Sequence, residues 1–294
     1  MTLLAVPNVS EGRDPDGIAA VARAFSGRGA RLLDMHSDPD HHRSVFTLAG
    51  EPGGLAYAVL DGAREALKQI DLQKHSGRHP RVGAVDVAPI VYLDDRDRGA
   101  ACAEALVLAD LMGTELEVPV LLYGLLAANR TRAELRRGGI PELERRVEAR
   151  ELVPDFGPRG LHPTAGAVLV AARPPLVAFN LELAPPATLA DAREIAGAIR
   201  EGGPDGFQGV RAIGLWLDER RVAQVSTNVE DHKGVPLRDV VSAVARRAEV
   251  AATELVGLAP KAAFDGFPTG VPVRNERTIE DALQSAGLSS GTEG

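Results

Sequence analysis

The sequence predicts an α/β (α+β) protein built from two related ferredoxin-like β-α-β-β-α-β subdomains. Apolar stretches of strand length alternate with amphipathic stretches of helix length along the chain. The order strand, helix, strand, strand, helix, strand occurs once in each half, and this order is typical of ferredoxin-like sheets. The 294 residues, of which 45% are hydrophobic and 25% charged, are enough for one large domain or two modest ones.

The first half opens with a buried strand at 3–7 and a helix at 13–27. Asp14 is placed to cap this helix, Pro15 occupies its first position, and Gly27 follows its end. Apolar density, β-branched content and helical spacing predict the elements that follow. These are strands at 30–36 and 43–50, a helix at 51–70, a strand at 82–93, a helix near 97–112, a strand at 118–124 and two short arginine-rich helical stretches up to about 150.

The second half repeats the order without visible sequence identity to the first. Its helices have recognisable starts, since Thr188 can cap one and Pro236 lies near the beginning of the other. The predicted elements are a strand at 175–183, a helix at 188–201, a hairpin of strands at 210–217 and 221–229, a helix at 236–250 and a strand at 253–259. We therefore expect an N-terminal subdomain at 1–173 and a C-terminal subdomain at 174–294.

Composition excludes several classes of protein. The single cysteine, Cys102, allows neither an internal disulfide nor a cysteine zinc site. No apolar run approaches the ~18 residues that a membrane span needs. A net charge of −8 with scattered arginines argues against nucleic-acid binding, which needs a basic face. We expect a cytoplasmic protein with no membrane and no nucleic-acid partner.

Two polar stretches follow the ends of strands in the first half. The first contains Asn8, Ser10, Glu11 and Gly12, and it can be either a functional loop or an ordinary strand-to-helix turn whose side chains satisfy the backbone. The second, residues 34–43, holds three histidines and three aspartates. Imidazole and carboxylate suit divalent ions, but the pattern favours a polar loop because no fixed ligand spacing is present.

Residues 74–81 place two histidines and three cations directly before an apolar strand. His75 and His79 are four apart, as in helical zinc motifs, but Gly77 and Pro80 disfavour a helix there and the motif lacks its glutamate. A histidine in such a position is suited to proton transfer near neutral pH.

Arginines in the same segment suit anionic substrates. Arg78 and Arg81 can hold carboxylates with their guanidinium forks. Their positive charge also opposes protonation of a nearby imidazole and keeps it available as a base. The segment therefore predicts proton transfer on anionic substrates rather than a covalent intermediate.

The stretch 153–166 is dense in glycine and proline. We expect it to connect the two subdomains, either as a plain linker or as a rigid ligand-binding loop between them.

With these stretches in view, the sequence resembles the glutamate formimidoyltransferase (formiminotransferase) family of folate enzymes over nearly its whole length. The matching motifs occur in the family's order: "VPNVSEGRD", "LLDMHSDPDHHRSVFTLAG", "KHSGRHPRVGAVDVAPIVYL", "VPVLLYG", "PDFGP", "LVAFNLEL", "VRAIGLWLDERRVAQVSTNVED" and "LVGLAP". The resemblance covers the formiminotransferase domain and not the cyclodeaminase domain to which it is often fused.

The resemblance implies a fold and an activity. The two subdomains would face each other with their sheets across a ligand tunnel, in a homodimer. The enzyme would move the formimidoyl group from N-formimidoyl-L-glutamate to N5 of tetrahydrofolate in histidine degradation. Tetrahydrofolate would be a co-substrate, and no metal is expected.

The resemblance also implies site residues. His79 corresponds to the family's catalytic histidine, which takes the proton from N5 and then protonates the departing glutamate amine. The arginines would hold substrate carboxylates, and the loop from "PDFGP" through Gly166 would bind folate. The expected substrate- and folate-binding residues are Asn8, His36, His42, Arg43, Arg78, Arg81, Gly157, Pro158, Thr164 and Gly166.

Four positions depart from the family pattern, and one of them is Arg78, where relatives often have an acidic residue. Familiar members carry an acidic residue at His36, an asparagine at His42 and a tryptophan at Ala165. These changes motivate two alternatives. One is a related formyl transferase acting between 5-formyltetrahydrofolate and glutamate. The other is a folate-binding or metal-binding protein without transferase activity, in which His36, His41 and His42 would hold the metal.

Overall fold

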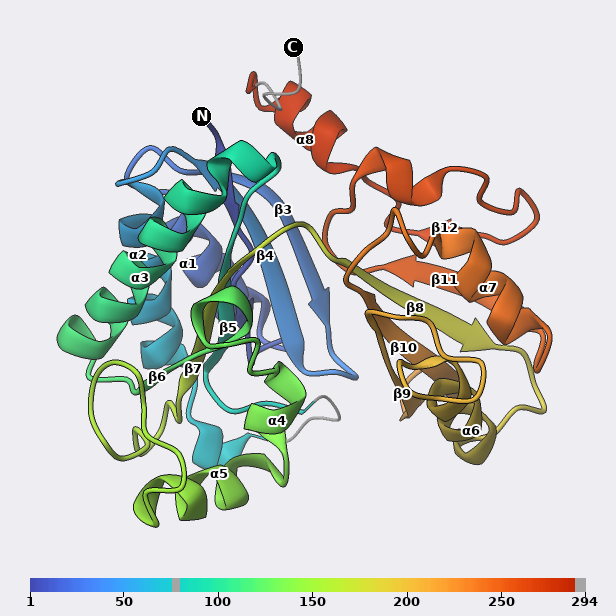
Figure 1. Cartoon of the computed structure of the whole chain (residues 1–294), viewed down its shortest axis with the longest axis horizontal. Helices are drawn as coiled ribbons and strands as arrows, with labels where there is room; N and C mark the ends of the chain where they lie inside the picture. The colour runs from blue at the N-terminus through green and yellow to red at the C-terminus, as the bar shows by residue number, and fades with distance from the viewer. Residues whose placement is uncertain (76–79, 289–294) are drawn as a thin grey trace. The chain divides into compact units, whose positions relative to one another are not determined.

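The computed structural model describes residues 1–75 and 80–288, which form two compact units, each a β-sheet with helices packed against it (Figure 1). Unit 1 comprises Met1–Pro174 and the end of the chain from Ala286, and unit 2 comprises Pro175–Ser285. The protein is thus a mixed α/β protein with two sheets. Among the described residues, every helix is too short or too polar to cross a membrane.

Unit 1 contains a seven-stranded sheet. Its strands are β1 (Leu3–Ala5), β2 (Asn8–Val9), β3 (Arg31–Asp38), β4 (Arg43–Gly50), β5 (Val85–Val91), β6 (Val120–Leu122) and β7 (Val168–Arg173). Its helices are α1 (Pro15–Phe25), α2 (Leu55–Gln69), α3 (Arg98–Glu115), α4 (Arg132–Arg136) and α5 (Gly139–Glu148). Strand β3 lies beside β4, and β4 and β5 flank both β1 and β2; β7 and β6 extend the sheet beyond β5.

Local sequence explains where the first elements begin and end. Asp14 caps α1 by accepting a hydrogen bond from the backbone N–H of Asp16 at 3.1 Å, and Pro15 opens the helix as expected. The strand predicted at 3–7 is divided, because Pro7 has no N–H to donate to a ladder. The chain resumes as β2, which pairs with β4 and β5 as β1 does.

The sheet of unit 1 is covered differently on its two faces. Helices α1, α2 and α3 lie against one face (Figure 1), where side chains such as Phe25, Phe46 and Leu108 form the larger core. A smaller core on the other face joins Leu135 of α4 and Leu143 of α5 to the sheet. The alternation of side chains along a strand explains why neighbouring residues enter different cores.

The stretch 153–166 does not connect the two units as expected. It leads from α5 into β7, so it lies within unit 1. The apolar strand β7 lies between β5 and β6 and pairs in parallel with both. A strand buried on both faces reads as a continuous apolar run, and no strand was predicted at 168–173.

The pairing pattern brings several strand ends to one edge of this sheet. Strands β2 and β3 end there, and the antiparallel partner β4 begins there with Arg43 opposite Asp38. Strand β5 begins at the same edge, since Val9 pairs with Val85, and β7 and β6 run parallel to it. The polar stretches identified in the sequence therefore meet at this edge.

Unit 2 contains a five-stranded sheet in the order β12-β11-β8-β10-β9, with α6 and α7 contributing to its core. Thr188 begins α6 with a capping box in which Asp191 takes part. The strands are β8 (Val177–Leu183), β9 (Val210–Leu217), β10 (Val222–Val229), β11 (Val250–Leu255) and β12 (Val273–Arg274). The helices are α6 (Leu189–Ile199), α7 (Leu237–Ala245) and α8 (Ile279–Ser285).

Candidate functional site

Arg43 and Asn8 form the first part of the site, at the edge where β2 ends and β4 begins. The guanidinium of Arg43 donates from Nε to Asn8 Oδ1 at 3.0 Å, and its Nη2 donates to the same oxygen. Asn8 Nδ2 donates to the carbonyl of Val6 at 3.0 Å, which fixes the orientation of the amide. The pair thus holds one guanidinium in a defined position at the sheet edge.

The turn after β2 packs tightly against the turn between β3 and β4. Glu11 Oε1 accepts hydrogen bonds from the backbone N–H groups of Gly12, Arg13 and Asp14 at 2.8, 2.7 and 3.0 Å. A Cβ on Gly12 would lie 2.3 Å from the carbonyl oxygen of Asp38, so only glycine fits there. The carboxylate of Glu11 is therefore held in place by the backbone of its own turn.

His42 lies against this turn. Its Nδ1 is 3.2 Å from the backbone nitrogen of Gly12, whose N–H also donates to Glu11 Oε1. Burial lowers the pKa of His42; Glu11, 3.4 Å from Nδ1, opposes this shift, and the cations of Arg13 and Arg81 add to it. His42 is consequently neutral at pH 7 and presents an N–H donor.

His75 stacks on His42. The ring centroids are 4.1 Å apart and the ring planes are inclined by 33°. Burial, the cation of Arg81 and the proximity of His42 lower the pKa of His75 to about 4. A base with this pKa is weak near neutral pH, because general-base catalysis is most effective when the pKa lies near the operating pH. His75 is therefore better suited to positioning than to proton transfer.

His79 and Arg78, both expected in the site, lie outside the described residues. The described residues on either side of them belong to the site. His75 precedes them and stacks on His42. Arg81 follows them, and burial lowers its pKa although Asp86 opposes the shift.

A buried carboxylate organises the residues that follow. Asp86 in β5 is 1% exposed, accepts a hydrogen bond from the N–H of Val82 at 2.8 Å and forms an ion pair with Arg136 of α4. Burial lowers the pKa of Arg43 to about 9; Asp86 opposes the shift, and Arg136 and Arg132 reinforce it. Arg43 remains a cation at pH 7, within a group of several guanidinium groups.

The expected folate loop is divided between two places. Gly166 bridges Gly83 across the start of β5, and the carbonyl of Thr164 accepts a hydrogen bond from the N–H of Leu72 at 2.9 Å. Gly157 packs instead against Gly113 near the end of α3, and Pro158 is exposed. The structure thus brings Thr164 and Gly166, but not Gly157 and Pro158, to the segment at 72–84.

The histidines considered for a metal are dispersed. His36 lies within β3 opposite Val45, and the backbone N–H of His41 is bound by Asp38 in the turn that follows. Within residues 1–75 and 80–288, the ring nitrogens of His36, His41 and His42 do not converge on a common point.

Sequence reasoning missed several residues of this site. His75 lies in the predicted cluster at 74–81 but was not predicted as a site residue. Glu11 was considered only as part of a turn. Asp86 and Arg136 are 50 residues apart in the chain, so no local pattern joins them. A carboxylate within an otherwise apolar strand was the available signal, because a buried charge requires a partner.

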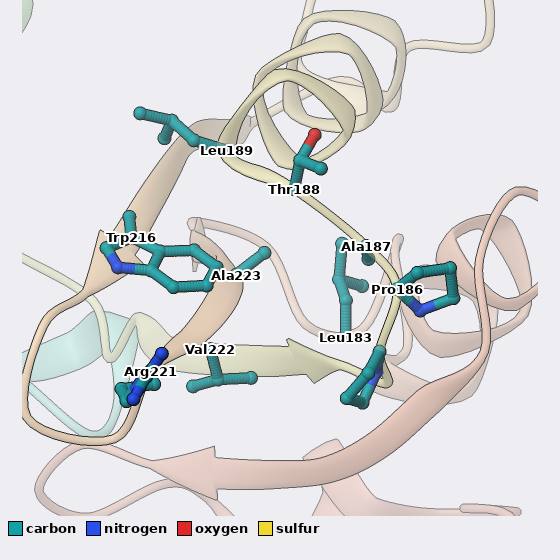
Figure 2. A pocket seen from close by; sticks show the side chains of 10 residues that line it. Leu183, Pro186, Ala187, Thr188, Leu189, Trp216, Arg221, Val222 and Ala223 are labelled. Carbon is teal, nitrogen blue, oxygen red and sulfur yellow. The ribbon is translucent and has the colours of Figure 1, made fainter.

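Unit 2 has a separate pocket of about 470 Å³, between the end of β8, the start of α6 and the β9–β10 hairpin (Figure 2). Trp216 lies on one side of it and Leu183 on another, with Arg221 at the hairpin. Thr188 is already bound to Asp191 in the helix cap. The lining of this pocket lacks an acid or base suited to group transfer. The edge of the sheet in unit 1 is therefore the better candidate for catalysis.

Comparison with known proteins identifies the family of the chain. The formiminotransferase N-terminal subdomain matches residues 2–173 and the formiminotransferase domain matches residues 178–267. The glutamate formimidoyltransferase of Streptococcus pyogenes serotype M1 is 36% identical over 270 residues, covering 88% of this chain and 89% of that protein. The glutamate formimidoyltransferase of Thermoplasma acidophilum is 32% identical, with 88% of each chain covered.

Longer proteins match as well. The formimidoyltransferase-cyclodeaminase of Mus musculus is 38% identical over 279 residues, which cover 88% of this chain and 50% of that protein. The present chain thus spans about half the length of these longer relatives.

Proposed function

Because the chain belongs to the formiminotransferase family, we propose that it is a glutamate formimidoyltransferase. The reaction moves the formimidoyl group from N-formimidoyl-L-glutamate to N5 of tetrahydrofolate and releases L-glutamate. The observation that carries this proposal is the match to glutamate formimidoyltransferases over most of both chains.

The proposed mechanism requires one acid/base group. N5 of tetrahydrofolate attacks the formimino carbon, and a tetrahedral intermediate forms. His79 removes the proton from N5 and then donates a proton to the glutamate nitrogen as its bond to carbon breaks. Holding two reactants in the correct geometry accounts for much of the rate enhancement of such bimolecular reactions.

The described residues support these roles. Since His75 has a pKa of about 4, it is a weak base near pH 7 and does not compete with His79 as the proton carrier. Arg43 and Arg81 are cations of the same site, suited to the carboxylates of both substrates. We assign the Asn8–Arg43 pair to carboxylate orientation, and Thr164 and Gly166 to the folate-binding segment.

We propose that the family's two-subdomain arrangement also applies, with boundaries at 1–173 and 174–294 and with both sheets facing a ligand tunnel. The strand orders support ferredoxin-like subdomains. In unit 1, β3, β4, β1/β2 and β5 are adjacent in that order, and in unit 2 the order β9, β10, β8, β11 repeats it. We also propose a cytoplasmic homodimer, and sedimentation of the purified protein as a monomer would contradict the dimer.

A substrate panel tests the proposed reaction. Purified protein is supplied with tetrahydrofolate and formimidoylglutamate, and in parallel with 5-formyltetrahydrofolate and glutamate. We expect turnover with the first pair to exceed turnover with the second. Turnover restricted to the second pair would favour formyl transfer, and turnover with neither would contradict a transferase.

A further inference from the structure

Three side chains of unit 1 form a group that the proposed mechanism does not use. Arg132 and Arg136 lie on α4, and Tyr123 follows β6; we call these residues the α4 cluster. The guanidinium carbon of Arg132 is 5.8 Å from the centroid of the Tyr123 ring. The spacing of four residues places both arginines on the same side of α4.

The α4 cluster contains polar groups that protein atoms leave unsatisfied. Within the described residues, the hydroxyl of Tyr123 has no hydrogen-bond partner although the residue is only 6% exposed. The buried Nε of Arg136 also lacks a partner there. Arg132 forms no ion pair with any carboxylate of the described residues, and its contact is the tyrosine ring. A buried donor without an acceptor destabilises the fold unless a ligand supplies one.

The helix that carries the two arginines is held rigidly. Thr131 and Glu134 form a capping box at its start. Leu135 is 1% exposed and anchors it in the smaller core. At its end, the buried guanidinium of Arg146 donates to the carbonyl oxygens of Glu134 and Leu135 at 3.0 and 2.7 Å. A preorganised group of donors loses little entropy when a ligand binds.

Among the charges that act on the neighbouring Arg43, cations outnumber carboxylates. Arg132 and Arg136 are near enough to Arg43 for their positive charges to lower its pKa. Asp86 is the carboxylate that opposes this effect, and it is already paired with Arg136. Arg132 and the side chain of Arg136, which is 14% exposed, remain accessible. An anion bound at this position would offset the excess charge.

We propose that the α4 cluster is a carboxylate-binding subsite in which Arg132 and the hydroxyl of Tyr123 donate hydrogen bonds to a substrate carboxylate. A guanidinium can hold a carboxylate through two parallel hydrogen bonds. The inference rests on the proposed function, in which the carboxylate comes either from formimidoylglutamate or from the glutamate tail of tetrahydrofolate. Both sources present the same group to the cluster.

The variants Tyr123→Phe and Arg132→Gln test this subsite. Arg136 is left intact because its removal would leave Asp86 buried without its ion pair. The matched control is Arg137→Gln, which removes the same charge from an exposed neighbouring residue. KM is measured for each substrate, and thermal unfolding is measured without substrate. We expect KM to rise on the order of 10-fold for one substrate in both variants, since a hydrogen bond to a charged group is lost.

The substrate whose KM rises identifies the source of the carboxylate. A purely structural hydroxyl would instead lower the unfolding temperature of Tyr123→Phe without changing either KM, and this result would overturn the subsite. KM values in both variants equal to those of Arg137→Gln would overturn it as well.

Binding of L-glutamate, followed by calorimetric titration, separates this inference from the proposed function. If the wild-type protein lacks turnover but binds L-glutamate more tightly than both variants, the reaction is wrong and a carboxylate subsite stands. The subsite is overturned if turnover is absent and the wild type binds L-glutamate no more tightly than the variants. It is also overturned if the wild type shows neither turnover nor binding.

Discussion

The chemistry of the site depends on how burial and nearby cations set the protonation of individual side chains. His42 and His75 are stacked, and both have lowered pKa values. Arg43 keeps its charge although burial lowers its pKa to about 9. The site therefore combines neutral imidazole rings with cationic guanidinium groups at neutral pH, an environment suited to anionic substrates and to a separate proton carrier.

The lowered pKa of His75 predicts a pH dependence of stability. The unfolded chain binds a proton at His75 near pH 6.5, whereas the folded chain binds it only near pH 4. The unfolded state therefore carries more protons between these values, and the free energy of unfolding decreases as the pH falls from 6.5 toward 4. We expect a smaller decrease in His75→Gln, measured by chemical denaturation at several pH values in this range.

Comparing the two proteins removes the contribution of carboxylates that both contain. If the free energy of unfolding decreased equally in wild type and His75→Gln, burial would not lower the pKa of His75.

Among the elements, the loop that precedes β7 has a strict backbone requirement. Gly166 has a φ of +69°, and a Cβ there would lie 2.2 Å from the carbonyl oxygen of Val82. The same loop is joined to the start of β5 by the hydrogen bond from the N–H of Ala84 to the carbonyl of Ala165, at 2.9 Å. Ala165 itself is 2% exposed and belongs to the larger core, so its small side chain fits a packed position.

Gly166→Ala is expected to destabilise unit 1 and weaken tetrahydrofolate binding. The left-handed backbone alone costs about 1–3 kcal/mol for a residue with a side chain, and the contact with Val82 adds to it. Gly160→Ala in the same loop is the matched control, because a Cβ there meets no atom within 4 Å.

Thermal unfolding and KM for tetrahydrofolate provide the measurements for both glycine variants. A Gly166→Ala protein with the melting temperature and KM of Gly160→Ala would show that the close approach at Val82 does not constrain this loop.

For the whole molecule, local patterns predicted most elements but not the way in which distant ones combine. The strand expected at 43–50 spans Arg43–Gly50, and the helix expected at 51–70 spans Leu55–Gln69. The strand at 168–173 was missed because its apolar run adjoins Pro174 and Pro175, which resemble a linker. Whether such a run is a strand depends on neighbours far away in the sequence.

The candidate site was predictable only in part, for the same reason. Asn8 and Arg43 were selected, but their mutual hydrogen bonds arise from the pairing of β2 with β4. Asp86, Arg136 and Tyr123 come from three separate elements, and only the folded sheet brings the first two together. Residues that act through long-range contacts leave no spacing signal in a single sequence.

We propose His79 as the proton carrier in formimidoyl transfer. The most direct test is turnover of tetrahydrofolate and formimidoylglutamate by the wild-type protein and by His79→Asn. Loss of a general acid/base typically lowers the rate by ~10²–10⁴-fold, so we expect kcat to fall by about that factor, with unfolding temperature unchanged. A His79→Asn protein that keeps more than a few per cent of wild-type kcat would exclude His79 as the proton carrier.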